Sequence, residues 1–302
     1  MNRNPAAGSG QRRDKMKKII LQGESTHDGA GVKLTRIFAH DHTKLTDPFL
    51  LLDHFGSDDP ADFIKGFPWH PHRGIETVTY MLDGIVEHGD SIGNAGTIGP
   101  GDIQWMTAGS GVIHQEMPKP LEGRMHGLQL WVNLPSEYKM MGSRYKGILG
   151  SDVPVVRIPG GEVRVIAGVF SNVKGPVQDL IVDVEYLDVR LKKGMSLSHT
   201  AEDGYSSFCY CIEGTGGFDD AKLKKTQLAL FAEAGSIAVK ATEDVHYIFV
   251  SGKQLNEPIA WGGPIVMNTR QELEMAFREL DEGTFIREKP ASKVSDLSFF
   301  YK

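Results

Sequence analysis

The sequence predicts an all-β protein built from two barrel- or sandwich-like domains, and three observations lead to this prediction. Short extended runs rich in Val, Ile, Thr, Tyr and Trp follow one another from residue 17 onward, as half-buried strands require. The 35 glycines and 15 prolines supply turns between these runs at close intervals. The pattern then recurs in the second half, and a length of 302 residues suits two domains.

The predicted strands fall into two sets. The first set lies within KKIILQ (17–22), GVKLTRIFAH (31–40), ETVTYMLDG (76–84), GDIQWMTAG (101–109) and LQLWVNLP (128–135). The second set lies within VRVIAGVF (163–170), LIVDVEYLDVRL (180–191), SSFCYCIEGTG (206–216), QLALFAEAGSIAVKA (227–241) and HYIFVSG (246–252). In each set one run ends in an acidic residue and a glycine, as MLDG (81–84) and CIEG (211–214). We infer an internal duplication whose two copies meet near residue 150.

One helix is predicted near the C-terminus, over residues 269–280. Thr269 and Glu272 have the spacing of a capping box, and Gly283 stands where a helix would end. A single apolar stripe follows the cap and is formed by Leu273, Ala276, Phe277 and Leu280.

Composition excludes several classes of function. The chain has 33 basic and 39 acidic residues, a net charge of −6, whereas a domain that binds nucleic acid usually has a basic excess. No stretch approaches 18 consecutive apolar residues, so no membrane-spanning helix is predicted. Two cysteines exclude a disulfide framework and fit a reducing compartment, so a cytoplasmic location is expected.

The clearest chemical signal is the pair of histidines in WHPHRGIE (69–76). Side chains alternate between the two faces of a strand, so His70, His72 and Glu76 share one face if the segment is extended. Pro71 biases His70 away from helix and supports that interpretation. Two imidazoles two residues apart on one strand can reach a single ion, and such a face would point into a barrel.

A second motif, AGSGVIHQE (108–116), places His114 and Glu116 on one face of another strand, directly after a glycine-rich turn. If the two motifs face each other across a barrel, the donor set is three imidazoles and one carboxylate. That set suits iron, manganese, copper, nickel or zinc. Four protein ligands would leave two octahedral positions open. The alternative is that these histidines only form hydrogen bonds in a polar barrel interior.

At these residues the sequence resembles the pirin family. The pattern G-x3-HxH-x3-E-x7-G from Gly66 to Gly84 is similar to a modified first cupin motif, and residues 100–118 resemble the modified second motif of pirins. HGLQLWVNLP (126–135) and GGPIVMNTRQELEMAFREL (262–280) also resemble pirin segments. The resemblance extends over nearly the whole chain, from about residue 17 to residue 285.

The resemblance implies two cupin-type β-barrel (double-stranded β-helix) domains with a short C-terminal helix. It implies one mononuclear transition metal per chain, with Fe(II) the first choice and Mn, Cu, Ni or Zn as alternatives. The implied ligands are His70, His72, His114 and Glu116. Glu76 then becomes a candidate for orienting an imidazole through its distal N–H. Spacing alone does not decide between Glu76 and Glu116 as the carboxylate ligand.

The second half departs from the metal-binding pattern. Where a second HxH would fall it offers Leu197-Ser198-His199-Thr200, and the later position offers residues 243–246 with the single His246. We therefore expect residues 1–16 to be a disordered arm, residues 17–150 to be a metal-binding N-terminal cupin domain, and residues 151–302 to be a degenerate, metal-free C-terminal cupin domain. Cys209 and Cys211 are expected to be buried on a strand.

The resemblance also implies the activity of a quercetin 2,3-dioxygenase, which opens a flavonol ring with loss of carbon monoxide. Glu116 or Glu76 would take the proton of the flavonol hydroxyl. The alternative is a non-enzymatic, metal- or redox-dependent regulator that binds a transcription factor or a metabolic enzyme. A monomer is expected, with a flavonol-like molecule and dioxygen as its small-molecule partners and no direct contact with nucleic acid or a membrane.

Overall fold

The computed structural model describes residues 18–119 and 123–287; the predicted arm at residues 1–16 lies outside them. The N-terminal barrel has a seven-stranded and a four-stranded sheet, all antiparallel. The large sheet contains β2 (Glu24–Asp28), β3 (Val32–Phe38), β4 (Phe49–Ser57), β6 (Ile75–Asp83), β9 (Ile103–Thr107), β11 (Met125–Asn133) and β12 (Arg144–Ile148). The small sheet contains β5 (Phe67–His72), β7 (Ile85–Asp90), β8 (Ala95–Ile98) and β10 (Val112–Lys119).

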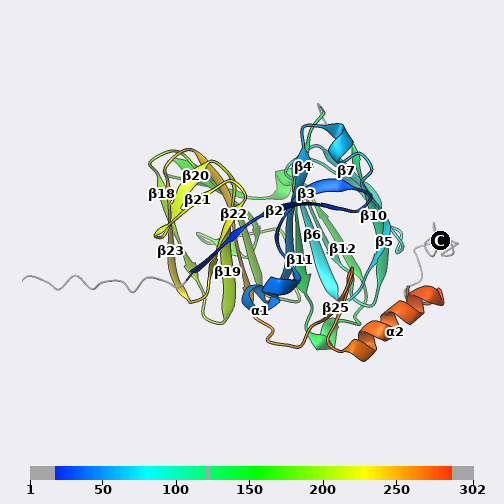
Figure 1. Cartoon of the computed structure of the whole chain (residues 1–302). Coiled ribbons are helices and arrows are strands. Elements are labelled where there is room, and N and C mark those ends of the chain that lie inside the picture. The colour runs from blue at the N-terminus through cyan, green and yellow to red at the C-terminus, as the bar shows by residue number, and fades with distance from the viewer. Residues whose placement is uncertain (1–17, 120–122, 288–302) are drawn as a thin grey trace, which may run out of the picture.

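The C-terminal barrel has the same construction. Its large sheet contains β1 (Lys18–Gln22), β13 (Val155–Ile158), β14 (Gly161–Ala167), β17 (Val184–Leu191), β19 (Tyr205–Glu213), β22 (Gln227–Phe231) and β24 (Val245–Lys253). Its small sheet contains β18 (Ser196–Ala201), β20 (Thr215–Phe218), β21 (Ala221–Lys224) and β23 (Gly235–Ala241). Figure 1 shows the two barrels side by side.

The strand orders of the two barrels correspond one to one. The order β12-β9-β6-β11-β4-β3-β2 matches β1-β22-β19-β24-β17-β14-β13, and β5-β10-β7-β8 matches β18-β23-β20-β21. The acidic-glycine turns are equivalent as well, because Gly84 follows β6 and Gly214 follows β19, with φ of 80° and 77°. The predicted all-β fold and its internal duplication are confirmed.

Segments from both ends of the chain cross to the other barrel. β1 pairs with β22 at the edge of the C-terminal sheet. In the opposite direction, β25 (Ala260–Gly262), β26 (Ile265–Met267) and the helix α2 (Arg270–Asp281) return to the N-terminal barrel, where Ile265 forms a bridge with Arg73. Figure 1 shows the dark-blue strand running between the barrels and the orange helix beside the N-terminal one. Each barrel is therefore completed by the far end of the chain.

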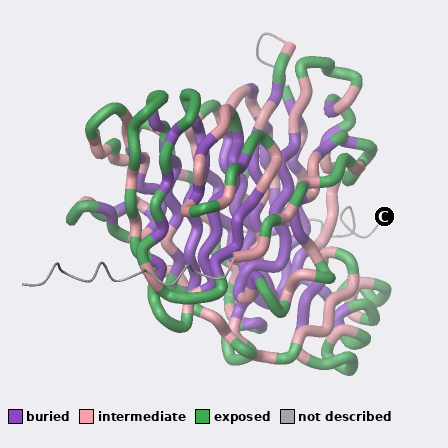
Figure 2. The backbone as a smooth tube through the Cα atoms, turned by 60° about the vertical axis from the view of Figure 1, so that its left-hand side comes forward, coloured by how far each residue is buried: buried purple, intermediate pink, exposed green. Residues whose placement is uncertain are grey.

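The two large sheets pack against each other through their outer faces. Along β6 the side chains alternate, so Val78 and Tyr80 enter this interface while Thr79 points into the N-terminal barrel. The opposing sheet contributes residues such as Phe208 and Ile248. Buried backbone consequently runs through the centre of the molecule, with exposed segments at its periphery (Figure 2).

The interiors of the two barrels differ in character. The C-terminal barrel is filled by apolar side chains, including the predicted buried pair Cys209 and Cys211, and leaves a space of only about 10 Å³. The N-terminal barrel buries polar side chains such as Asp53, Thr79 and Glu116, and it encloses a cavity of about 680 Å³. The C-terminal barrel is thus tightly packed, whereas the N-terminal barrel encloses a cavity.

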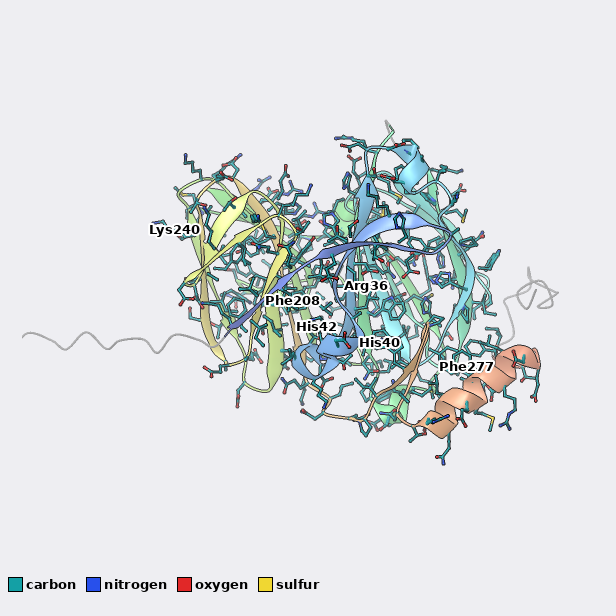
Figure 3. The ribbon with its side chains drawn as sticks, viewed as in Figure 1. Arg36, His40, His42, Phe208, Lys240 and Phe277 are labelled. Carbon is teal, nitrogen blue, oxygen red and sulfur yellow. The ribbon has the colours of Figure 1, made fainter. Side chains whose placement is uncertain are left out.

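The predicted C-terminal helix is confirmed as α2. Its Thr269 side chain accepts from the Glu272 N–H while the Glu272 carboxylate accepts from the Thr269 N–H, as a capping box requires. The predicted stripe is only partly buried: Ala276 is fully enclosed, but Phe277 is 40% exposed at the edge of the contact (Figure 3). The described residues contain no helix that is long and apolar enough to span a membrane.

Candidate metal centre

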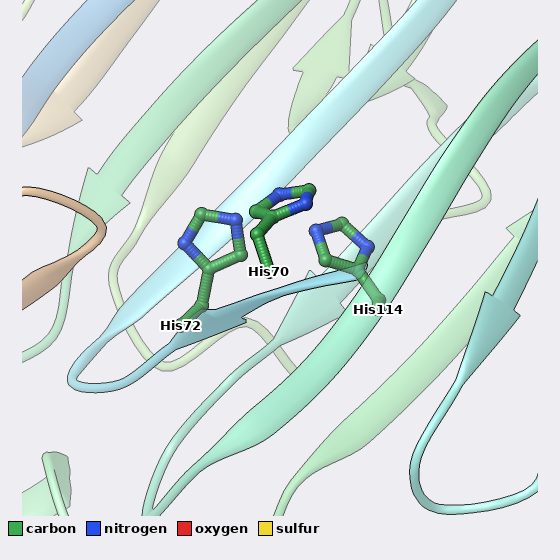
Figure 4. Close-up of side chains that lie close together, drawn as sticks. All are labelled: His70, His72 and His114. Carbon is green, nitrogen blue, oxygen red and sulfur yellow. The ribbon is translucent and has the colours of Figure 1, made fainter. Parts of the chain in front are cut away.

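Three imidazoles converge inside the N-terminal barrel. His70 and His72 are on β5, and His114 lies opposite His70 on the paired strand β10. One ring nitrogen from each lies within 4.8 Å of the others, and this is the one group of three or more metal-capable side chains in the described part of the chain. Figure 4 shows the three rings turned toward a common point. The alternation of side chains along extended β5 brings His70 and His72 to one face, as the sequence predicted.

The expectation that the extended segment continues from His72 to Glu76 is wrong. β5 ends at His72, and the chain turns at Gly74, whose φ is 76°. A side chain at this position would strike the carbonyl of Val266, because a Cβ there would lie 2.0 Å from that oxygen. The turn places Glu76 on β6, in the other sheet of the barrel.

Glu76 is consequently directed away from the three histidines. It lies on the same face of β6 as Val78, and its two carboxylate oxygens accept hydrogen bonds from Trp105 Nε1 (3.1 Å) and Thr107 Oγ1 (2.6 Å). Burial raises the pKa of this carboxyl, and the two donors oppose that shift. Both oxygens of Glu76 are therefore bound by neighbouring side chains at the interface between the two large sheets.

Two of the imidazoles have their tautomers fixed by backbone carbonyls. His70 Nδ1 lies 2.8 Å from the carbonyl of Pro68, and His72 Nδ1 lies 3.1 Å from the carbonyl of Pro264. A carbonyl only accepts, so Nδ1 carries the hydrogen in both rings and Nε2 keeps its lone pair. This is the arrangement in which a histidine is oriented for a metal. Nothing in the local sequence pointed to Pro264, which lies almost 200 residues from His72.

His114 provides the test of whether this group fits a metal. Its side chain is fully buried, and neither ring nitrogen has a hydrogen-bond partner among the described residues. Burial, together with the neighbouring imidazoles, holds the pKa of His114 well below its usual value, so the ring is neutral. A buried polar nitrogen without a partner is costly. A metal ion bound by the three rings would satisfy it.

Glu116 lines the same cavity as His70 and His72 but lies outside the group of three imidazoles. Its Oε1 accepts from Thr79 Oγ1 (2.8 Å) and from Gln104 Nε2 (3.3 Å). Its Oε2 has no hydrogen-bond donor within the described residues. One oxygen of the carboxylate is therefore held in place, and the other remains available to a metal or a substrate.

His88 also lies near the candidate centre. It precedes a glycine-rich turn in the sequence, and it is buried as the cross-strand neighbour of Glu116. Its Nε2 is 3.4 Å from the Asp90 carboxylate, and its ring stacks on Tyr145 with centroids 4.9 Å apart. Burial of an HxD pair on β7 is decided by the pairing of β7 with β10, which the local pattern does not encode.

The cavity beside the histidines has mostly aromatic and apolar walls. Trp131 comes from β11 and Trp261 from β25, with ring centroids 5.9 Å apart. His40 stacks on Trp261 at 3.8 Å. The C-terminal segment therefore forms one wall of a cavity in the N-terminal barrel. The sequence could not show this, because Trp261 is far from the two motifs along the chain.

Lys139 connects this wall to the turn that follows β5. Its ammonium is buried, with the residue only 1% exposed, and it donates to Gly74 O (2.9 Å), Val266 O (3.0 Å) and Asn133 Oδ1 (2.7 Å). Burial lowers the pKa of this amine to about 7. Three acceptors match the three donors of a charged ammonium.

The corresponding strands of the C-terminal barrel do not reproduce the group. β18 corresponds to β5 and carries His199, whose Nε2 contacts Glu185 at 2.7 Å. β23 corresponds to β10 and has the sequence GSIAVKA, without an imidazole, thiol or carboxylate. His246 lies on β24 and contacts Asp188 at 2.7 Å. The absence of metal from this barrel stays a prediction.

The chain is similar to known proteins over both barrels. The sequence model of the pirin family matches residues 31–132, and that of the pirin C-terminal cupin domain matches residues 186–286. A Pseudomonas aeruginosa protein named "Putative quercetin 2,3-dioxygenase" is 41% identical over 269 residues, which cover 86% of this chain and 94% of that protein.

Two solved structures extend the comparison. A quercetin 2,3-dioxygenase from Acinetobacter baumannii is 34% identical to this chain and superimposes with a TM-score of 0.83. The match covers 90% of this chain and 98% of that protein. A bacterial pirin from Escherichia coli in complex with nickel(II) is 19% identical and shares the fold, with a TM-score of 0.63. The match covers 79% of this chain and 99% of that protein. Both family models and the 41% identical relative identify the same family, and the paired barrels are consistent with it. The chain therefore belongs to the pirin family.

Proposed function

We propose that this chain is a metal-dependent dioxygenase of the quercetin 2,3-dioxygenase type, with His70, His72, His114 and Glu116 as the metal ligands. The observation that carries the proposal is the buried, unpartnered imidazole of His114 beside two oriented imidazoles at a large cavity. The similarity to proteins named as quercetin 2,3-dioxygenases supports the reaction type. Fe(II) is our first choice of metal, and Mn, Cu, Ni and Zn suit the same donors.

When bound, the metal would act as a Lewis acid on a substrate hydroxyl and supply the redox chemistry of dioxygen. The protein also supplies the proton acceptor: Thr79 and Gln104 hold Oε1 of Glu116, and Oε2, which would bind the metal through one lone pair, keeps a second lone pair for the proton. A general base must lie within hydrogen-bond reach of the proton that it takes. Glu76 is not assigned this role, because both of its oxygens are occupied by Trp105 and Thr107.

The remaining residues of the cavity bind and orient a flat substrate. Trp131 and Trp261 offer aromatic faces on one wall, and Phe67 lies on the strand that carries the histidines. Aromatic walls bury a large apolar area and restrict water near the reacting groups. A cavity of about 680 Å³ falls in the ordinary range for small-molecule sites.

The test is turnover of quercetin by the purified, iron-loaded protein, in air and under anaerobic conditions. One dioxygen and one flavonol should give one ring-opened product and one carbon monoxide. We expect oxygen-dependent loss of flavonol absorbance with stoichiometric carbon monoxide, and loss of both in His114→Ala. Equal rates in wild type and His114→Ala would mean adventitious oxidation. No turnover with Fe, Mn, Cu or Ni would refute the proposed dioxygenase activity and favour the alternative, a metal-dependent regulator of a partner protein.

A further inference from the structure

A row of polar side chains crosses the interior of the N-terminal barrel. Gln104 on β9 lies opposite Thr79 on β6, and Thr79 lies opposite Gln129 on β11. Gln129 in turn lies opposite Asp53 on β4, and Asp53 lies opposite Arg36 on β3. Residues directly opposite on paired strands place their side chains on the same face. Four of the five also line the cavity, namely Thr79, Gln129, Asp53 and Arg36.

One end of the row is at the candidate metal centre. Thr79 Oγ1 is 2.8 Å from Glu116 Oε1 and 2.7 Å from the amide oxygen of Gln129. A hydroxyl donates one hydrogen, and the carboxylate can only accept it. The Gln129 amide is therefore turned so that its NH₂ donates to Thr79, an assignment that amide atoms allow. Its carbonyl oxygen then faces the cavity as an acceptor.

The other end of the row is an ion pair. Arg36 donates to both carboxylate oxygens of Asp53, from Nε to Oδ1 at 2.9 Å and from Nη2 to Oδ2 at 2.7 Å, and its Nη2 also reaches Asp28 at 2.7 Å. Asp53 is 4% exposed, and the Arg36 guanidinium contacts the carboxylates of both Asp53 and Asp28. Two carboxylates against one guanidinium leave this end of the cavity with a net negative charge.

The distance between the two ends of the row matches the length of a small aromatic molecule. Neighbouring strands are spaced by about 4.8 Å, so Thr79 and Asp53 lie about 10 Å apart across two spacings. The cavity is continuous between them, and its other walls are mostly aromatic and apolar. A flat molecule that engages Glu116 at one end therefore brings its far end to Asp53. Each Asp53 oxygen has one lone pair left after the hydrogen bond from Arg36.

We propose that Asp53, fixed by Arg36, is a specificity subsite for neutral hydroxyl groups on the end of an aromatic substrate remote from the metal. This inference rests on the proposed function, and it assigns the residue that would recognise hydroxyl groups on the substrate ring remote from the metal. A hydroxyl donates to the carboxylate, and hydrogen bonds to charged groups are the stronger kind. An anionic substituent is disfavoured by the net negative charge, and an unsubstituted ring gains nothing at this end.

The experiment measures binding without turnover. Nickel-loaded protein is titrated anaerobically with 3-hydroxyflavone, with its 3′,4′-dihydroxy derivative and with its 4′-carboxylate, by quenching of tryptophan fluorescence. Trp131 and Trp261 in the cavity wall supply the signal. For wild type we expect the dihydroxy compound to bind about tenfold more tightly than 3-hydroxyflavone, the order expected for one such hydrogen bond. The carboxylate should bind more weakly than both.

Asp53→Asn should reduce the tenfold preference to about twofold or less, and it should improve binding of the carboxylate. The control is Asp62→Asn, which removes a carboxylate from the exposed pair with Lys33 and should leave all three affinities unchanged. If Asp53→Asn fails to fold, the double variant Arg36→Met/Asp53→Leu replaces the ion pair by apolar groups of similar size, an exchange that proteins often tolerate. It should abolish the preference.

The outcomes separate this inference from the proposed function. A preference that survives in both variants overturns the subsite, even if the enzyme turns over. Equal wild-type binding of 3-hydroxyflavone and its dihydroxy derivative overturns it as well. A preference that Asp53→Asn abolishes, in a protein that shows no oxygen-dependent turnover, establishes the subsite and refutes the dioxygenase.

Discussion

At the scale of single residues, the two glutamates of the motifs have opposite surroundings. Glu116 has one open carboxylate oxygen beside the cavity, whereas both oxygens of Glu76 are bound by Trp105 and Thr107. They share a residue type and similar burial. The difference arises from the face of the sheet on which each lies, so removing each carboxylate should have a different consequence.

We expect Glu116→Ala to lose bound metal with little change in stability of the metal-free protein. Glu76→Ala should retain metal but lower the free energy of unfolding by about 2 kcal/mol, because a buried Trp105 N–H loses its acceptor. Glu76→Gln is the matched control, since its amide can pair with both neighbours. Elemental analysis and denaturant unfolding measure the two effects. Metal loss in Glu76→Gln with retention in Glu116→Ala would reverse the assignment.

At the scale of elements, the C-terminal segment is part of the N-terminal site. The Pro264 carbonyl fixes the His72 tautomer, and Lys139 ties Val266 to Gly74. Arg73 adds a second tie, since its guanidinium donates to Glu279 on α2 at 2.7 Å. Two buried basic side chains therefore hold β26 and α2 against the turn that follows β5.

Lys139→Met should weaken metal binding without removing any ligand. The methionine side chain has a similar length, but it removes the ammonium that donates to three oxygens and so loosens Val266, two residues after Pro264. We expect the metal affinity to fall by roughly tenfold, the size of effect seen when a group that orients a ligand is lost. Competition with a chelator measures it. Lys33→Met, in an exposed ion pair, is the control, and equal affinities in the two variants would contradict the role of Lys139.

At the scale of the whole molecule, the interface between the barrels contains a neutral histidine. His54 on β4 places Nδ1 2.8 Å from the hydroxyl of Tyr210 on β19, across the interface. Burial lowers the pKa of His54 to about 3. Between about pH 3 and 6.5 the unfolded chain therefore carries a proton on this residue that the folded protein lacks. Stability from this group is lost as the pH falls through that window.

The double variant His54→Phe/Tyr210→Phe removes both polar partners. Between pH 6.5 and pH 5 the free energy of unfolding should fall by about 2 kcal/mol more in wild type than in this variant. This is the difference expected from one histidine whose pKa is lowered in the folded protein. Denaturant unfolding of the metal-free proteins at the two pH values measures the difference. His27→Gln, at an exposed histidine, should follow wild type. Identical pH dependence in the double variant and wild type would show that His54 is protonated in the folded protein.

The sequence by itself determined features that depend on neighbours along the chain. Alternation and turn residues predicted many of the strands and the duplication, although the predicted runs did not include β4, β7 and β8. The capping box predicted α2, and the spacing of His70 and His72 predicted a shared face, and the structure confirms both. These features are local, because the period of a strand and the hydrogen bonds of a cap involve residues only a few positions apart.

Only the tertiary structure decided how distant segments complete one another. The turn at Gly74 removed Glu76 from the face of the histidines, and the return of the C-terminal segment brought Pro264 and Trp261 to the site. The pairing of β3, β4, β6 and β11 joined Arg36 to Glu116 through one polar row. Contacts of this kind depend on sheet register and barrel closure. The packing of the whole chain sets both, and no local pattern encodes them.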